Sequence, residues 1–144
     1  MEDDFGHWIA GFIDGEGCFR VHKGKGGSYY SCCFTLKLRD DEEEVLNQIV
    51  EETGIGYLKP DRSRSGNSKP CLVWTVGSKE TCVALVELLD RFPLRARKAQ
   101  DYRIWREAVL FWVHQKKGNR WHGPRDWSQM IRYKKAIEEA RRYS

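Results

Sequence analysis

The sequence predicts an α+β fold in which helices cover one face of an antiparallel sheet. Apolar and polar side chains alternate over residues 18–23 and 29–38, the pattern of strands with one buried face. A second pair of strands is expected at residues 56–62 and 69–76. Helical patterns precede, separate and follow the two pairs, so the helices are expected to form a layer on the sheet. The 144 residues suffice for one domain with a substantial core.

The first strand pair has the clearest alternation in the chain. Phe19 and Val21 are expected to point inward from its first strand, and the Gly-Lys-Gly-Gly at residues 24–27 indicates a hairpin turn. The second strand would be half-buried, with one apolar face and one hydrogen-bonding face. Its inward residues are expected to be Tyr30, Cys32, Phe34, Leu36 and Leu38.

The second pair is joined by a polar loop at residues 63–68. In its last strand Leu72, Trp74 and Val76 are expected to face inward. The outward residues of that strand would be Lys69, Cys71, Val73 and Thr75.

Helix signals surround the two strand pairs. Asp40 or Asp41 is expected to cap a helix that ends at Gly54, and Ser78 to cap another. Further helices are expected to begin near Ala96 and near Asp126. The predicted apolar stripes comprise Val45, Leu46, Ile49 and Val50, then Val83, Val86 and Leu89, and finally Trp127, Met130, Ile131 and Ile137.

Helices on one face leave the other face of the sheet open and polar. Residues 1–58 hold 5 Lys/Arg against 12 Asp/Glu, whereas residues 59–144 hold 20 against 9. This asymmetry favours a polyanion-binding surface that draws mainly on the later segments, although an ordinary solvated sheet face remains the alternative. The open face is expected to carry Arg20, His22, Tyr29, Ser31, Thr35, Lys37, Tyr57 and Lys59.

The most informative stretch is Ile9–Gly17, which reads Ile-Ala-Gly-Phe-Ile-Asp-Gly-Glu-Gly. Gly11 and Gly15 are four residues apart, so a helix would place them on one face, where another backbone can approach closely. The acids Asp14 and Glu16 would lie at the C-terminal end of that helix, where its dipole disfavours negative charge. Such acids are expected to have a cationic partner, and a bound metal ion is the obvious one.

This stretch resembles the nine-residue motif of the LAGLIDADG homing endonucleases. Five motif positions are identical, and the other four are changed conservatively. The resemblance implies a homing-endonuclease-like fold with a saddle-shaped sheet, and it identifies Glu16 as the ligand of a divalent metal over the scissile phosphate, with Gly15 beside it. Mg²⁺ is the expected cofactor, with Mn²⁺ or Ca²⁺ as other divalent candidates. The identical residues are Ala10, Gly11, Ile13, Asp14 and Gly17.

The resemblance also assigns a catalytic cation. In the family a Pro-Leu segment leads to a lysine beside the metal, and here Pro93 and Leu94 lead to Lys98. Arg97 is the alternative, because a slip of one residue in the match would exchange the two. Either residue would polarise the attacking water or neutralise charge on the phosphate, and positioning of the phosphate without catalysis is the third possibility.

One motif copy implies a homodimer, because a duplex break needs two active sites. The expected partners are therefore a second copy and a double-stranded DNA site that is roughly palindromic. The interface residues would be Trp8, Ala10, Gly11, Phe12 and Asp14. The DNA-binding residues would be Arg20, His22, Lys23, Tyr29, Ser31, Thr35, Lys37, Tyr57, Lys59, Arg62, Arg64, Lys69 and Thr75.

The expected activity is Mg²⁺-dependent hydrolysis of phosphodiester bonds in both DNA strands, in the setting of a mobile intron or an intein. The alternatives are a LAGLIDADG-fold RNA maturase or transcription regulator without cleavage, and a general basic architectural protein. Residues 1–117 are expected to form the core domain, with residues 118–144 as its C-terminal helical extension. Five cysteines without a Cys-x-x-Cys pair, an acidic N-terminus and no long apolar run predict an intracellular protein that is not membrane-bound, in the bacterial cytoplasm or an organelle.

Overall fold

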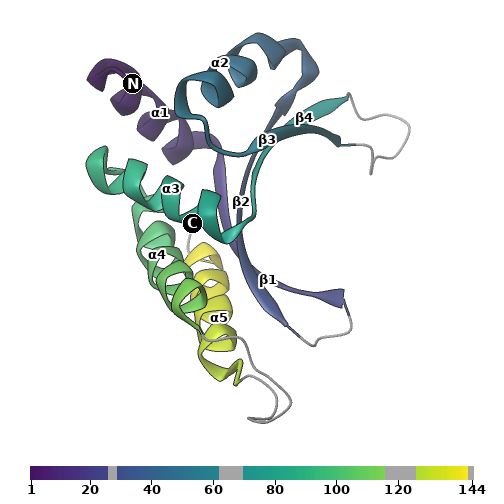
Figure 1. Cartoon of the computed structure of the whole chain (residues 1–144), viewed down its shortest axis with the longest axis vertical. Helices are drawn as coiled ribbons and strands as arrows, with labels where there is room; N and C mark the ends of the chain where they lie inside the picture. The colour runs from purple at the N-terminus through teal and green to yellow at the C-terminus, as the bar shows by residue number, and fades with distance from the viewer. Residues whose placement is uncertain (26–28, 62–69, 116–125, 143–144) are drawn as a thin grey trace.

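The computed structural model describes residues 1–25, 29–61, 70–115 and 126–142. Within this part of the chain an antiparallel sheet of four strands lies against a layer of helices (Figure 1), which confirms the predicted α+β fold. The elements run α1 Asp3–Glu16, β1 Gly17–Lys23, β2 Tyr30–Arg39, the 3₁₀ turn η2 Asp40–Glu42, α2 Glu43–Thr53, β3 Tyr57–Asp61, β4 Cys71–Val76, α3 Lys79–Arg91, α4 Lys98–His114 and α5 Ser128–Arg142. No helix among these is both long and apolar enough to cross a membrane.

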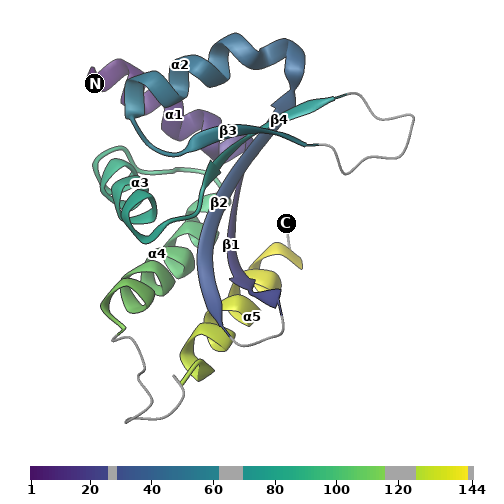
Figure 2. The ribbon, with the colours of Figure 1, turned by 45° about the vertical axis from the view of Figure 1, so that its right-hand side comes forward.

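The strand order is β1-β2-β4-β3, so β1 and β3 form the edges. Both β1 with β2 and β2 with β4 pair antiparallel, and the curvature of these strands is visible in Figure 2. The predicted alternation is confirmed in β1 and β2, where Phe19, Phe34 and Leu36 are buried under the helices. The sheet therefore has one covered face and one open face.

The covered face and the helices share one hydrophobic core. Its centre is aromatic: the Phe19 ring lies 5.0 Å from that of Phe34 and 5.1 Å from that of Trp105, measured between centroids. The indole Nε1 of Trp105 donates hydrogen bonds to the carbonyls of Arg20 (3.2 Å) and Cys33 (3.0 Å). These bonds satisfy a polar atom of the core and fix α4 beneath β1 and β2.

Three helix ends show what the sequence predicted well and what it did not. Gly54 ends α2 with a φ of 65°, a left-handed conformation in which glycine costs least. The expected cap at Asp40 or Asp41 is wrong, because these acids lie in η2 and the N-cap of α2 is Glu42, which makes no capping hydrogen bond with its side chain. Ser78 does cap α3, in a reciprocal capping box with Thr81.

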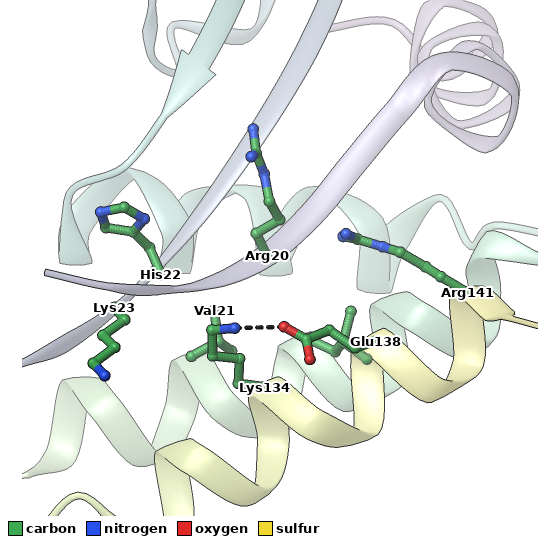
Figure 3. A pocket seen from close by; sticks show the side chains of 8 residues that line it. Arg20, Val21, His22, Lys23, Lys134, Glu138 and Arg141 are labelled. Carbon is green, nitrogen blue, oxygen red and sulfur yellow. Dashed lines mark hydrogen bonds and ion pairs between the residues drawn. The ribbon is translucent and has the colours of Figure 1, made fainter. Parts of the chain in front are cut away.

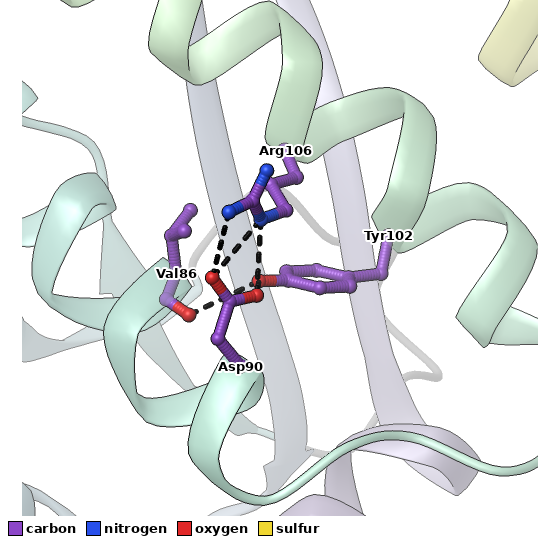
Figure 4. A network of polar contacts seen from close by, with 4 residues as sticks. All are labelled: Val86, Asp90, Tyr102 and Arg106. Atoms are coloured by element: carbon purple, nitrogen blue, oxygen red, sulfur yellow. Dashed lines mark hydrogen bonds and ion pairs between the residues drawn. The ribbon is translucent and has the colours of Figure 1, made fainter.

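Helices α3 and α4 are locked together by a polar network (Figure 4). Arg106 donates to both carboxylate oxygens of Asp90, from Nε at 3.0 Å and from Nη2 at 2.9 Å. The Tyr102 hydroxyl lies 2.9 Å from Asp90 Oδ1 and 3.1 Å from the Val86 carbonyl. Hydrogen bonds from Arg106, and secondarily from Tyr102, hold the pKa of Asp90 below its ordinary value. The network sets the orientation of α4, whose first residue is Lys98.

The C-terminal helix α5 lies beside α4 and against the edge strand β1. Met130 and Ile137 are its buried residues, as predicted, and both belong to the common core. Trp127 and Ile131 are half-buried against that core. Asp126 accepts a hydrogen bond from the Ser128 amide at 2.9 Å, so it supports the start of α5 two residues later than expected.

Candidate active site and nucleic-acid interface

The end of α1 is tied to the segment that leads into α4. Asp14 Oδ2 accepts hydrogen bonds from the backbone amides of Arg95 (2.7 Å) and Ala96 (3.0 Å). Two N–H groups on one carboxylate oxygen make a strong, charge-assisted anchor. Asp14 is therefore a structural residue within its own chain, the role that the sequence suggested for it beside its place in the predicted interface.

This anchor brings Lys98 to the motif. Lys98 Nζ donates a 3.0 Å hydrogen bond to the carbonyl of Gly15, the residue before Glu16. Arg97 precedes α4 as its N-cap residue, with an exposed side chain. Of the two cations that the sequence left open, the structure thus brings Lys98 to the end of α1, and Arg97 makes no hydrogen bond or ion pair with the motif residues.

Glu16 ends α1 with an exposed carboxylate that has no hydrogen bond or ion pair to any described residue. A carboxylate and a nearby carbonyl are hard oxygen donors, which suit Mg²⁺ or Ca²⁺. Among the described residues no group of three or more His, Cys, Asp or Glu side chains is placed to hold a metal ion. The motif thus fits a divalent cation in the type of its oxygen donors.

The face of α1 that carries the motif glycines is open. A Cβ atom built on Gly11 or on Gly15 would meet no atom of the described residues within 4 Å. By contrast, a Cβ on Gly6 would lie 2.3 Å from the Phe92 ring, and one on Gly17 would lie 2.7 Å from the Phe34 ring. Packing within the chain therefore explains Gly6 and Gly17 but leaves Gly11 and Gly15 unexplained.

Aromatic residues border this open face. Trp8 is 42% exposed, and its ring stacks on Phe12 with centroids 5.1 Å apart and lies 5.5 Å from the ring of Phe5. Ala10, which the sequence placed in the interface with Gly11, is only 3% exposed because it shares the buried side of α1 with Gly6 and Ile13. As an interface residue Ala10 is therefore a correction: its methyl group packs within its own chain.

The predicted DNA-binding residues form rows across the open face of the sheet. The register places Tyr57, Thr75 and Thr35 opposite one another on β3, β4 and β2, and the next row is Lys59, Val73 and Lys37. Arg20 pairs with Cys33, and His22 with Ser31, on the other side of β2. Residues on the same side of neighbouring strands stand side by side, so the rows form one surface.

Two details of this surface depart from the prediction. Lys37 Nζ lies 2.8 Å from Asp61 Oδ2, an acid of β3 that the sequence analysis did not include, so the charge of Lys37 is partly compensated. Lys23 pairs with the buried Tyr30, which places it on the side of β1 opposite to Arg20 and His22 (Figure 3). Lys23, which the sequence predicted as a DNA-binding residue, therefore lies off the open face, on the side of the groove described next. The predicted contacts Arg62, Arg64 and Lys69, and part of the 24–27 turn, lie outside the described residues.

A groove runs between the edge strand β1 and α5 (Figure 3). Its strand side carries Arg20, His22 and Lys23, and its helix side carries Lys134 and Arg141. The acid in it, Glu138, is ion-paired to Lys134. Positive charge thus extends from the open face around the edge of the sheet to α5.

The comparisons with known proteins decide the family. The model of the family described as LAGLIDADG endonuclease matches residues 9–109, from the first residue of the motif to the middle of α4. The chain belongs to the LAGLIDADG endonuclease family. Of the elements described above, the match takes in the end of α1, the whole sheet and Lys98, and it leaves α5 outside.

Curated relatives of the chain carry names of two kinds, endonuclease and RNA maturase, which match two of the functions that the sequence left open. The chain is 29% identical over 109 residues to the probable intron-encoded endonuclease Cox1-I1b of Schizosaccharomyces pombe, covering 74% of this chain and 27% of that protein. It is 44% identical over 86 residues to the intron-encoded RNA maturase bI4 of Saccharomyces cerevisiae, covering 60% of this chain and 12% of that protein. The chain therefore spans a minor part of these relatives.

Solved LAGLIDADG structures share the fold. The homing endonuclease I-GzeII in complex with its DNA target gives a TM-score of 0.74 at 18% identity, covering 94% of this chain and 44% of that chain. I-SmaMI, bound to an uncleaved DNA target in the presence of calcium ions, gives 0.70 at 22% identity, covering 93% and 45%. At these identities the likeness establishes the fold, and in each case the chain matches less than half of the neighbour.

Proposed function

We propose that the chain is a homing endonuclease that acts as a homodimer and hydrolyses both strands of a long, near-palindromic double-stranded DNA site with a divalent metal. The observation that carries the proposal is the open face of α1, where Gly11 and Gly15 lead to the free carboxylate of Glu16 with Lys98 beside it. A glycine in a helix interior costs about 1 kcal/mol against alanine, and no packing among the described residues offsets that cost at Gly11 or Gly15. Close contact with a second helix would offset it.

A second copy of the chain is the proposed occupant of that face. Two copies of α1 crossing at Gly11 and Gly15 would bring the two Glu16 carboxylates together, and the exposed Trp8 and the half-buried Phe12 would be covered. The solved neighbours support this arrangement, because the chain matches only 44% of I-GzeII and 45% of I-SmaMI, and a second copy would supply the remainder. Two-fold symmetry then requires a site with matching half-sites.

In the proposed hydrolysis each of these residues has a separate role. Glu16 would hold the divalent cation, which when bound activates water and stabilises charge on the leaving oxygen. Lys98, fixed at the Gly15 carbonyl, would neutralise charge on the scissile phosphate. The rows of the open face would contact base edges in the major groove, and the basic edge of β1 with α5 would contact backbone phosphates. The calcium ions in I-SmaMI support a divalent cation, with Mg²⁺ our proposed one.

One alternative has a specific observation in its favour. The identity of 44% to the RNA maturase bI4 supports a nucleic-acid-binding protein of this fold that assists splicing without cutting DNA. The free Glu16 carboxylate and the position of Lys98 favour cleavage instead, because binding alone requires neither. The relatives named as intron-encoded favour an intron over an intein as the genetic setting.

The test is to incubate the protein with a library of DNA duplexes and Mg²⁺ and to sequence the resulting ends. Paired ends at a discrete site are expected, and retention of duplexes without new ends would instead support the binding protein. Glu16→Gln should abolish cleavage while dimerisation and DNA binding persist, because the amide keeps the shape and removes the charge. Glu16→Asp should retain at least partial Mg²⁺-dependent cleavage.

Gly11→Leu should fail differently, because its side chain would force the paired helices apart and give a monomer. Sizing the protein in solution separates the two failures. Cleavage by the Glu16→Gln protein at the wild-type rate would refute the assignment of the active site.

A further inference from the structure

Asp101 is a buried acid that the proposed chemistry does not use. It lies in the first turn of α4 and is 8% exposed, the one charged residue of the described chain that is buried. Burial raises the pKa of its carboxyl group, and the nearby charges of Arg141 and Lys98 lower it again. A buried carboxylate is costly unless cations compensate its charge, and Arg141 and Lys98 are the cations that do so for Asp101.

The first partner joins Asp101 to the C-terminal helix. Arg141, near the end of α5, places its Nε 4.0 Å from Asp101 Oδ2. The same guanidinium donates from Nη2 to the carbonyl of Phe19 in β1. Arg141 is thus held between β1 and α4 rather than free in solvent, and it fixes Asp101 from one side.

The second partner joins Asp101 to the motif. Lys98 lies three residues before Asp101 on α4, which puts the two side chains on the same face of the helix. Its ammonium group also donates the 3.0 Å hydrogen bond to the Gly15 carbonyl. Arg141 therefore links α5 to Asp101 through an ion pair. Lys98 links Asp101 to the end of α1 through charge attraction and through its own hydrogen bond to the Gly15 carbonyl.

We propose that Asp101 is a positioning residue which, itself held by Arg141, fixes Lys98 against the end of the motif helix, so that α5 controls the geometry of the active site. The proposal rests on the proposed function in one respect, namely that Lys98 acts on the phosphate. It gives a specific role to a helix that lies outside the family match at residues 9–109. On this proposal α5 is part of the catalytic apparatus as well as a flanking phosphate-binding element.

A simpler role for Asp101 makes a different prediction. An acid in the first turn of a helix interacts favourably with the helix dipole, whatever its neighbours do. In that case Arg141 would affect Lys98 only by direct repulsion between two cations. Removing Arg141 would then make the Lys98 ammonium more firmly held, whereas on our proposal its removal frees Asp101 and loosens Lys98. The two roles therefore predict effects of opposite sign.

The experiment follows the ammonium protons of Lys98 by NMR in the full-length protein labelled with ¹⁵N-lysine, the signal being assigned by its absence in Lys98→Arg. In Asp101→Asn we expect these protons to exchange with water about threefold faster or more. This is the effect of removing one unit charge that lies one helical turn away, if the dielectric constant between the groups is close to that of water. Arg141→Gln should also speed the exchange, and Arg141→Lys should largely restore it. Glu107→Gln removes the same charge from an exposed position on α4 and is the matched control.

The double variant Asp101→Asn/Arg141→Gln completes the test. If Arg141 acts through Asp101, its exchange rate should equal that of Asp101→Asn alone, because the two effects are not additive within one network. Unchanged exchange in Asp101→Asn, slower exchange in Arg141→Gln, or additive effects would each overturn the proposal. Thermal melts establish that each variant is folded.

A cleavage assay then separates this proposal from the proposed function. Asp101→Asn should lower the rate of cleavage with little change in DNA affinity, because Lys98 remains present but is less well placed. If the wild-type protein does not cut DNA while the exchange results hold, the nuclease proposal fails and the coupling of α5 to Lys98 stands. If the wild type cuts and Asp101→Asn cuts equally fast, the positioning role fails.

Discussion

Gly11→Ala separates what α1 needs within one chain from what it needs in an assembly. The added methyl group meets nothing within 4 Å in the single chain, so only the helix propensity changes. We therefore expect the isolated protomer to gain about 1 kcal/mol of stability. For a protein of 144 residues this corresponds to a rise of about 4 °C in melting temperature. In the proposed dimer the same methyl group would be overpacked between the paired helices, so the dimer should dissociate about tenfold more readily or more.

Both effects can be measured on one variant. Urea denaturation of dilute protein reports the protomer, and sedimentation across a range of concentrations reports the dimer. Gly6→Ala is the matched control, because its Cβ would lie 2.3 Å from the Phe92 ring and the overpacking offsets or exceeds the same gain in propensity. A Gly11→Ala protomer that is less stable than wild type would refute the open-face geometry. A dimer of unchanged affinity would place the interface elsewhere.

Three further predictions concern other parts of the molecule. Replacing Lys134 and Lys135 together by glutamine should reduce the slope of log affinity for DNA against log salt concentration by about 2, and an unchanged slope would show that these lysines of α5 do not contact phosphates. Asp90→Asn should cost at most about 1 kcal/mol near neutral pH, since the Arg106–Asp90 pair is partly exposed. The pKa of Asp90 is lower in the folded protein than in the unfolded chain. The loss of unfolding free energy in Asp90→Asn should therefore be largest at pH values above the ordinary carboxyl pKa, and it should disappear as the pH falls through the folded pKa of Asp90. Burial raises the pKa of Cys82 to about 12, so in alkylation with mass-spectrometric readout this thiol should react only on unfolding.

The strands and their faces were predictable because alternation along a strand directly records which side chains are buried. Residues 29–38 alternate between apolar and polar side chains almost without exception, and the burial of side chains along β2 follows this alternation. The pairing of Lys37 with Asp61 was not predictable, because the two lie on β2 and β3 with β4 between them, and strand order is a property of the whole sheet. Only the position of the acid was readable, because Asp61 lies two residues after Lys59 and so on the same face of β3.

In the candidate site, too, the residues fixed by local sequence patterns were predictable and those fixed by tertiary packing were not. The motif gave Glu16 and the Pro-Leu segment gave Lys98, and the structure brings Lys98 next to Glu16 at the Gly15 carbonyl. The sequence prediction placed Ala10 in the interface, although its spacing of four residues from Gly6 and three from Ile13 puts it on the inner face of α1. The environment of Asp101 was not, since it depends on Arg141, which is forty residues away in the sequence and is brought close by the packing of α5.

The acidic helix α2 and the basic helix α5 lie at opposite ends of the sheet (Figure 1), and all seven acids between Asp40 and Glu52 are exposed. The protomer is therefore a large electric dipole whose positive pole lies at the edge formed by β1 and α5. A polyanion such as DNA exerts a torque on such a dipole before any contact forms. The molecule should thus approach DNA with the β1 edge leading and α2 turned away. The first collisions would then already have roughly the orientation in which the open face can contact the DNA.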